Sequence, residues 1–311
     1  MDHRESAKVS CIVIFLNAER FMQEAIDSVF AQTVTNWELI LVDDGSSDGS
    51  SDLAGALAAA HPERVRVLEH EERQRRGVGA SRNLGVEAAR GEYVAFLDAD
   101  DVWVSTQLEE QLAVLKLHPE AAAVFGRTRY WYSWTGHPDD CRRDYDAALS
   151  IRFDRVIVPP TLFPHLLSPG ESAFFCICSL LLRREIIERV GRFEPEFVDL
   201  YEDMAFHAKV LLVSPVYVSS ATWGWYRQHP DSTCAVAERD GSTRDATRHF
   251  LGWVAAYLNR SGASTRELRK MVNQRRWWLE HPILDAGRVR IELQLRRLAS
   301  VRHPNSSFHS R

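Results

Sequence analysis

The chain has 311 residues, of which 45% are hydrophobic and 26% are charged, as is usual for a globular protein with a full core. Its formal net charge of −5 gives no reason to expect nucleic-acid binding. Five scattered cysteines predict reduced thiols and a cytoplasmic location, and no apolar run reaches the roughly 20 residues of a membrane-spanning helix.

The first hundred residues alternate between two hydrophobic periods. Continuous β-branched and aromatic runs predict strands buried on both faces, and apolar residues at helical spacing predict helices between them. In chain order, strands are expected at residues 9–16, 37–42, 65–68 and 93–97, with helices near 21–29, 52–60 and 80–88. This alternation predicts an α/β protein with a doubly wound, mostly parallel sheet.

Two acidic clusters follow expected strands, VDDGSSDGS after the second and LDADD after the fourth. In such sheets ligands bind beyond the carboxyl ends of the strands, so both clusters are expected on one rim. Asp98, Asp100 and Asp101 would repel one another unless a cation such as Mn²⁺ or Mg²⁺ lay between them. Capping of the next helix is the alternative, although a cap needs only one short polar residue. The pattern indicates a phosphate ligand and a metal.

A third acidic pair lies further along the chain. LYEDMAFHAKV places Glu202 and Asp203 at the start of a helix, where acids also favour the helix dipole by about 0.3 to 1 kcal/mol. FFCICSLLLRR predicts a strand with Cys176 and Cys178 on one face. Two thiols supply too few ligands for zinc, so we expect them to be buried thiols.

Four motifs in order resemble the family 2 glycosyltransferases of GT-A fold. They are VSCIVIFLNAERF with VDDGSSDGS, RGVGASRNLGVEAARGEYVAFLDADD, VGRFEPEFVDLYEDMAFHAKV and WYRQHPDS, and the resemblance covers residues 8 to 235. It implies inverting transfer of a sugar from a nucleotide diphosphate donor, UDP above all, with Mn²⁺ or Mg²⁺. The acceptor would be a hydroxyl of a glycan, a lipid-linked molecule or a small molecule. A silent nucleotide-sugar-binding protein and a nucleotidyltransferase of related fold are the alternatives.

The resemblance also assigns roles on the donor side. Asp44 would accept a hydrogen bond from the base, and Phe15 and Asn17 would hold the base edge. The family often has Pro-x-Tyr-Asn where this chain has Ile-Phe-Leu-Asn, which leaves the identity of the base open. Arg82 would lie at the nucleotide pocket or pair with a neighbouring acid, and Asp98 would contact the ribose.

For the reaction itself, the resemblance makes Asp203 the general base and lets Glu202 position the acceptor or an arginine. Asp100 would hold the metal, His229 would complete its shell, and Arg227 would touch phosphate. A turn residue before proline is the alternative for His229.

These assignments divide the chain into three parts. Residues 1–104 would be the nucleotide-sugar-binding half, 105–235 the acceptor-binding half, and 236–311 a basic, mainly helical extension. From residue 260 onward, twelve Lys/Arg stand against four acids, a charge of +8, which leaves −13 for the remainder. The extension either packs its tryptophans and leucines on the main domain or contacts an anionic membrane surface as a peripheral protein.

Overall fold

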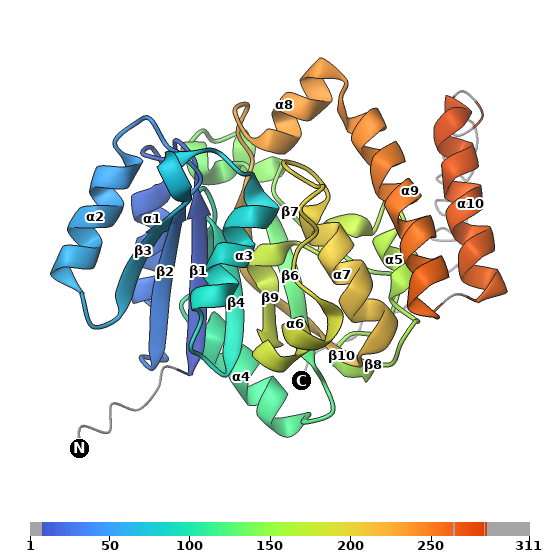
Figure 1. Ribbon diagram of the computed structural model, residues 1–311, viewed down its shortest axis with the longest axis horizontal. Helices are drawn as coiled ribbons and strands as arrows, with labels where there is room; N and C mark the ends of the chain where they lie inside the picture. Colours follow the sequence, from blue (N-terminus) through green and yellow to red (C-terminus); the bar gives the residue numbers. More distant parts are fainter. Residues whose placement is uncertain (1–7, 264, 283, 285–311) are drawn as a thin grey trace. The chain divides into compact units, whose positions relative to one another are not determined.

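The computed structural model describes residues 8–263, 265–282 and 284 (Figure 1). The chain divides into two compact units, with the boundary between Thr243 and Arg244. The strands are β1 (Val9–Phe15), β2 (Trp37–Asp43), β3 (Val65–Glu69), β4 (Tyr93–Asp98), β5 (Val102–Trp103), β6 (Ala123–Trp131), β7 (Tyr145–Asp146), β8 (Arg155–Ile157), β9 (Leu180–Arg183) and β10 (Val216–Arg227). The helices are α1 (Met22–Phe30), α2 (Ser50–Ala60), α3 (Val78–Ala88), α4 (Gln107–Leu117), α5 (Phe163–Leu166), α6 (Arg184–Val190), α7 (Glu202–Val213), α8 (Thr233–Asp240), α9 (Thr243–Ser261) and α10 (Arg266–Glu280).

Within the described residues, ten strands form one sheet. Eight of them follow the order β3-β2-β1-β4-β9-β6-β10-β5, while β7 pairs with β6 and β8 with β10. β1 is parallel to β2 and β4, and β3 is parallel to β2. β9 runs antiparallel between β4 and β6. The prediction of a mostly parallel α/β sheet is confirmed, and the predicted boundaries of the first four strands differ from the observed ones by one residue at most.

Helices cover both faces of this sheet. Along β1, Val9, Cys11 and Val13 belong to a core cluster that includes residues of α1, α2 and α4. The alternate residue Ile12 meets Gly85 of α3, where an added Cβ would lie 2.5 Å from an Ile12 methyl group. Strands buried on both faces explain the continuous apolar runs in the sequence.

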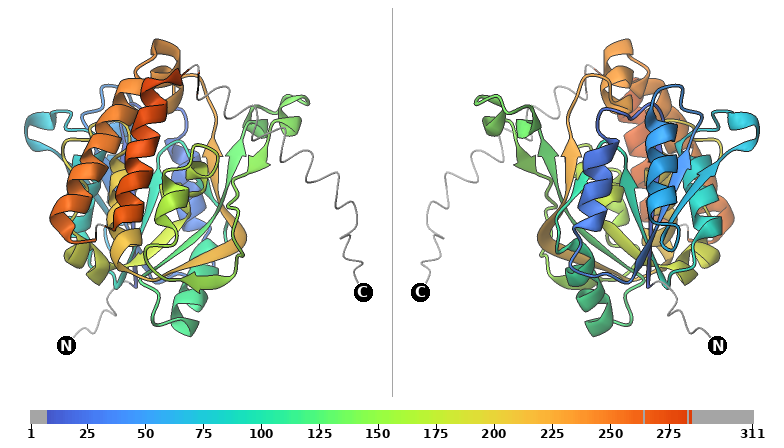
Figure 2. Two further views of the ribbon diagram at one scale, coloured as in Figure 1. Left: turned by 90° about the vertical axis from the view of Figure 1, so that its right-hand side faces the viewer. Right: turned by 90° about the vertical axis from the view of Figure 1, so that its left-hand side faces the viewer.

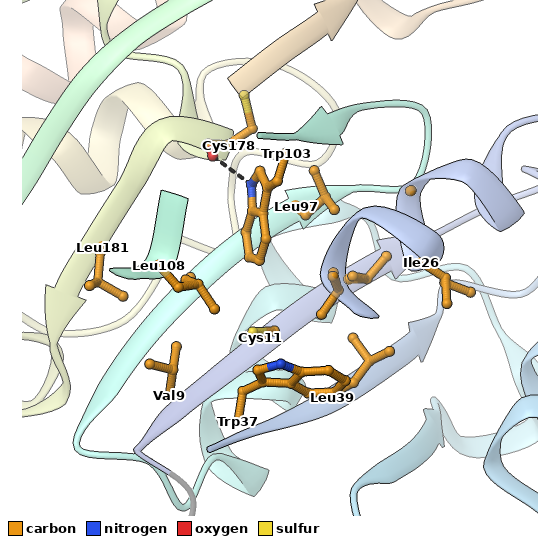
Figure 3. Packing of buried hydrophobic residues seen from close by; sticks show 14 of the residues in the cluster. Val9, Cys11, Ile26, Trp37, Leu39, Leu97, Trp103, Leu108, Cys178 and Leu181 are labelled. Carbon is orange, nitrogen blue, oxygen red and sulfur yellow. Dashed lines mark hydrogen bonds between the residues drawn. The ribbon is translucent and has the colours of Figure 1, made fainter. Parts of the chain in front are cut away.

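The core cluster on the first face is closely packed (Figure 3). Cys11 and Leu39 are fully buried there beside Trp37, and Leu108 of α4 is also fully buried. Burial of each large apolar side chain contributes about 1.5 to 3 kcal/mol. This core holds β1, β2 and β4 rigidly and thus fixes the loops that follow them.

The second half of unit 1 is built on β6 and β10. These parallel strands pair from Val216–Ala123 to Arg227–Trp131, with two register shifts near Thr222. The long β10 also pairs with the short β5, which directly follows the LDADD cluster. Residues 132–145, shown in green, project from this half of the unit (Figure 2). The end of β10 is therefore held beside the acidic cluster.

Unit 2 contains α9 from Arg244 onward and α10. Within this unit Arg248 forms an ion pair with Glu280, with 2.8 Å between the Arg248 Nε atom and the Glu280 carboxylate. Among residues 8–263, 265–282 and 284, no helix combines the length and apolar character that a membrane crossing requires. The predicted charge excess of the C-terminal extension lies partly outside the described residues.

Candidate active site

Three parallel strands end at one edge of the sheet and bring the acidic segments together. The register pairs Phe15 at the end of β1 with Asp43 on β2, and Ile14 with Asp98 on β4. Because the strands point the same way, the loops after β2 and β4 open on one rim, which is where α/β proteins bind ligands. The two acidic clusters therefore share one site.

Asp44, which follows β2, is enclosed by the loop that precedes α3. Its carboxylate accepts hydrogen bonds from the main-chain N–H groups of Arg76 and Gly77, at 2.8 and 3.0 Å, and from the Ser81 hydroxyl at 3.0 Å. Only 4% of the residue is exposed. Its Oδ2 atom accepts a hydrogen bond from the Gly77 N–H, lies 3.9 Å from the Arg75 Nε atom, and keeps capacity for another donor. The predicted contact with a base therefore depends on this single oxygen.

Asn17 joins the loops after β1 and β2. Its side-chain oxygen accepts hydrogen bonds from the main chain of Ser47 and Asp48, at 2.7 and 3.3 Å. Asn17 adopts a φ of 51°, a left-handed conformation that asparagine tolerates better than most residues. The Phe15 side chain, by contrast, is 3% exposed and lies in the core. The assignment of Phe15 to base binding is thus limited to its main chain.

Arg82 connects the two acidic regions from the middle of α3. Its guanidinium donates to Asp98 at 2.6 Å and to Glu202 at 2.5 Å, and the arginine side chain is 2% exposed. The alternative prediction for Arg82, pairing with a neighbouring acid, is thus what the structure contains. A buried guanidinium with two fixed partners holds the end of β4 against the start of α7.

Burial perturbs the acids around Arg82. It raises the pKa of Glu202 to about 8, and the neighbouring charge of Asp203 adds to the rise. Burial also raises the pKa of Asp203 and of Asp98, while the Arg82 charge opposes both rises. Tyr201, just before α7, has a φ of 69°, which is rare for a bulky residue and is found most often near functional sites. Perturbed acids and local backbone strain therefore coincide here.

Asp100 and His229 form a pair suited to a divalent cation. The His229 Nε2 atom lies 3.0 Å from the Asp100 carboxylate, and the two side chains are 7% and 29% exposed. Two adjacent ligands of an octahedral ion with bonds of about 2.1 Å lie about 3 Å apart. Oxygen and nitrogen donors suit Mn²⁺ and accommodate Mg²⁺. The residues present therefore fit the predicted metal.

Arg227 has a different environment from the predicted one. Its guanidinium donates to the Asp100 carbonyl at 2.7 Å and to Glu24 at 2.5 Å, and it lies 4.5 Å from the Trp131 ring centroid. The residue is 2% exposed. Its main-chain N–H donates to Asp101 at 2.9 Å. Arg227 therefore stabilises the loop that carries Asp100 and Asp101 by hydrogen bonds. The family resemblance instead assigned it to contact with phosphate.

Several contacts at this site carry no sequence signal. The loop that encloses Asp44 and the Glu24 partner of Arg227 arise from tertiary packing between distant segments. Cys176 and Cys178 lie at a 3-10 helix, Ile177–Ser179, and the strand β9 starts only at Leu180. The prediction that both thiols lie on a strand is therefore wrong. Their proximity to Asp101 could not be read from spacing.

Comparison with known proteins agrees with this geometry. The sequence model described as Glycosyl transferase family 2 matches residues 10–191. An uncharacterized glycosyltransferase, EpsJ of Bacillus subtilis strain 168, is 28% identical over 258 residues, which are 80% of this chain and 69% of EpsJ. S. aureus TarS 1–349 in complex with UDP-GlcNAc has a TM-score of 0.61 at 18% identity, over 86% of this chain and 70% of TarS 1–349. The mannosyltransferase PcManGT of Pyrobaculum calidifontis, in complex with GDP-Man and Mn²⁺, has a TM-score of 0.57 at 19% identity, over 88% and 69% of the two chains.

The mixed sheet and its acidic rim thus define a GT-A glycosyltransferase fold. The family match extends over more than half of the sequence. The chain belongs to glycosyl transferase family 2 and is a glycosyltransferase.

Proposed function

We propose that this glycosyltransferase is a metal-dependent, inverting enzyme that takes its sugar from a UDP-sugar. The observation that carries the proposal is the Arg82 guanidinium, which binds Asp98 from the donor half and Glu202 from the acceptor half. Asp203 follows Glu202 directly, and its carboxyl experiences the charges of both Arg82 and Asp98. The acids on either side of a bound sugar are thereby held at a fixed separation.

The donor would lie along the rim from Asp44 to Asp98. Asp44 Oδ2 would accept a hydrogen bond from the base, and Asp98 would accept from the ribose. TarS, a neighbour in fold, is described with UDP-GlcNAc, and PcManGT, a second neighbour, with GDP-Man. The acceptor hydroxyl belongs to a glycan, a lipid-linked molecule or a small molecule.

Asp100 and His229 would hold Mn²⁺ or Mg²⁺. The cation, when bound, supplies positive charge for the diphosphate that leaves. Arg227 contributes by fixing the main chain of Asp100 and Asp101, and thus the direction of the Asp100 carboxylate. This role needs no direct contact between Arg227 and phosphate.

Asp203 would act as the general base. The acceptor oxygen attacks the anomeric carbon as the bond from that carbon to the diphosphate oxygen breaks, and the hydroxyl proton passes to the Asp203 carboxylate. A pKa raised by burial makes the ionised carboxylate a stronger base, provided that it remains ionised at the working pH. Glu202, held by Arg82, would orient the acceptor side of the site.

Two variants test these roles separately. Thermal-shift titration with UDP, GDP, dTDP and CDP, each with and without Mn²⁺, identifies the nucleotide base of the donor. Asp203→Asn should keep the nucleotide shift and lose about 100-fold or more of the slow release of UDP from a UDP-sugar. Asp100→Asn should lose the Mn²⁺-dependent part of the shift. Asp52→Asn, on the exposed side of α2, is the control and should change neither.

Opposite outcomes reject the assignments one at a time. UDP release that continues at the wild-type rate in Asp203→Asn excludes this residue as the general base. A Mn²⁺-dependent shift that persists in Asp100→Asn places the metal on other residues. A larger shift with GDP than with UDP corrects the donor and leaves both other assignments intact.

We also propose that the C-terminal extension brings the enzyme to an anionic membrane surface, with the rest of the chain in the cytoplasm. The support is its charge of +8 from residue 260 onward, against −13 for the remainder. In α10, Trp277 is 46% exposed beside this charge. Arginine and tryptophan together suit the interface between headgroups and water.

A further inference from the structure

Two cysteines and one aspartate gather beneath the acidic rim. The Sγ atoms of Cys176 and Cys178 lie 3.1 Å apart, and one ligand atom from each of these cysteines and from Asp101 lies within 4.8 Å of the others. Asp101 comes from the turn between β4 and β5, while the cysteines come from the 3-10 helix before β9. Two segments about 75 residues apart in sequence thus meet at one point. Local secondary-structure preference does not account for this meeting, and ligands of a metal site often come from distant segments.

The Asp101 carboxyl is incompletely bonded. The residue is fully buried, and its Oδ1 atom accepts from the Arg227 N–H at 2.9 Å. Its Oδ2 atom is buried and has no hydrogen-bond partner among the described residues. Buried polar atoms in native proteins are almost always satisfied, because an unsatisfied one costs about 1 to 3 kcal/mol. The oxygen therefore indicates a ligand between Asp101 and the two sulfurs.

The Cys178 main chain is held in place, so the cluster has a rigid base. The Trp103 indole N–H donates to the Cys178 carbonyl at 2.7 Å, shown as the dashed line in Figure 3. The Gln107 side chain donates to the same carbonyl at 3.0 Å. Residues that do not contact a ligand themselves often fix its ligands in this way.

We propose that Asp101, Cys176 and Cys178 bind a soft divalent cation of the zinc class. Two thiolates and one carboxylate make a set of donors that favours such an ion over Mn²⁺ or Mg²⁺. Two sulfurs bound to one tetrahedral zinc at about 2.3 Å lie about 3.8 Å apart, so the pair needs to open only slightly. A water molecule takes the fourth position.

This site is distinct from the catalytic metal position. Asp100 pairs with His229, whereas Asp101 meets the sulfurs and the main chain of Arg227. A cation on the sulfurs would tie the turn after β4 to the segment before β9, and through Arg227 to β10. It would stiffen the support of Asp100 without contacting the substrate. The inference does not depend on the proposed sugar donor or on Asp203 as the general base.

Cobalt supplies a direct test, because Co²⁺ bound by thiolates absorbs through sulfur-to-metal charge transfer and Co²⁺ bound by oxygen and nitrogen does not. We expect the full-length, reduced chain to develop this absorption, with an intensity that corresponds to one thiolate-bound Co²⁺ per chain. Cys176→Ser and Cys178→Ser should abolish it, and Asp101→Asn should weaken Co²⁺ binding at least tenfold. Cys141→Ser, at an exposed thiol outside the cluster, and Asp100→Asn should both keep the absorption.

Three results would overturn the proposal. They are the absence of charge-transfer absorption in the intact chain, its persistence in both Cys176→Ser and Cys178→Ser, and a thiol count of three in the unreduced, denatured protein. The last result would mean that a disulfide joins Cys176 and Cys178 in place of the cation. Circular dichroism checks the fold of each variant. If Asp101→Asn fails to fold, the partly exposed Cys176 still provides the deciding substitution.

Discussion

Arg82 connects two acidic segments of the candidate active site. Its side chain is buried, and its guanidinium has one carboxylate partner on β4 and one on α7. Removal of one member of a buried ion pair leaves the other charge without compensation and typically costs about 3 to 5 kcal/mol. Arg82 therefore stabilises the fold as well as the site.

We expect Arg82→Met to lower the free energy of unfolding by about 3 to 5 kcal/mol, because Glu202 then lacks its buried partner. Urea denaturation at pH 9, above the Glu202 pKa of about 8, measures the change with this carboxylate ionised. Arg90→Met, at an exposed position just after α3, should stay within about 0.5 kcal/mol of the wild type. The double variant Arg82→Met with Glu202→Met should be more stable than the single one. Equal stability of the two would show that loss of the ion pair is not the cause.

His207 of α7 is a second buried titratable residue, and it is uncharged. The residue is fully buried, and neither ring nitrogen has a hydrogen-bond partner within the described part of the chain. Burial, together with the smaller effect of the Arg82 charge, lowers its pKa from 6.5 to about 3. As the pH falls, His207 therefore becomes protonated near pH 6.5 in the unfolded chain, but only near pH 3 in the folded chain.

This difference predicts an acid-dependent loss of stability. Between pH 6.5 and 3 the unfolded state binds more protons, so stability falls as the pH falls. His207 alone should cost about 2 kcal/mol at pH 5 relative to pH 7.5, since each pKa unit corresponds to about 1.4 kcal/mol. His207→Phe should remove this component from urea curves taken at both pH values. His61→Phe, at a partly exposed ring, should retain it. A pH dependence unchanged in His207→Phe would contradict the assignment.

At the level of elements, two glycines distinguish the effect of close packing from the effect of helix propensity. Gly126 of β6 lies against the Trp223 ring of β10, and an added Cβ would be 2.2 Å from a ring carbon. Gly55 of α2 is exposed, with no atom within 4 Å of such a Cβ. The same substitution should therefore have opposite effects at the two positions.

We expect Gly126→Ala to destabilise the protein by about 1 to 3 kcal/mol, because Trp223 is buried and cannot move without separating β6 from β10. Gly55→Ala should stabilise it by up to about 1 kcal/mol, because alanine favours a helix more than glycine does. Thermal unfolding of both variants measures the difference. A Gly126→Ala variant as stable as Gly55→Ala would mean that the strands are less tightly packed than the structure indicates.

The sequence predicted those elements whose signal is local. Val9–Phe15 is apolar apart from Ser10, and Tyr93–Asp98 is apolar up to its final aspartate, so the hydrophobic pattern alone located β1 and β4. Thr106 and Glu109 have the spacing of a capping pair, but Thr106 makes no side-chain cap bond, and Glu109 instead accepts a hydrogen bond from Thr33 at 2.7 Å. That bond joins residues 76 positions apart, and single-sequence propensity carries no information about it.

In the candidate site, too, local patterns were predicted from the sequence and long-range contacts were not. The placement of Asp44 and Asp98 on one rim followed from the parallel order of the strands. The environment of Arg227 did not follow from the sequence, because it depends on how β10 pairs with β6 and with β5. The resemblance to a family supplied chemical roles, but it could not show which atoms are already bonded within the protein. The position of Phe15 in the core and the clustering of Cys176, Cys178 and Asp101 are both consequences of packing.

At the level of the whole molecule, charge is distributed unevenly along the chain. The excess of +8 from residue 260 onward should draw that part toward anionic lipid, while the −13 of the remainder should keep the rest in water. Within α10, Lys270 and Arg276 are exposed. Each basic residue near an anionic surface contributes about 1 kcal/mol to binding.

The full-length protein should therefore sediment with vesicles that contain phosphatidylserine and remain in solution with phosphatidylcholine alone. Lys270→Gln with Arg276→Gln should weaken binding about 30-fold, because two charges of about 1 kcal/mol each are lost. Arg90→Gln with Lys116→Gln removes the same charge from exposed sites in unit 1 and should leave binding unchanged. Binding should also fade near 1 M salt, where charges are screened within about 3 Å. Equal losses in both double variants would indicate a general charge effect, and no sedimentation at about 0.15 M salt would favour an extension that only packs against protein.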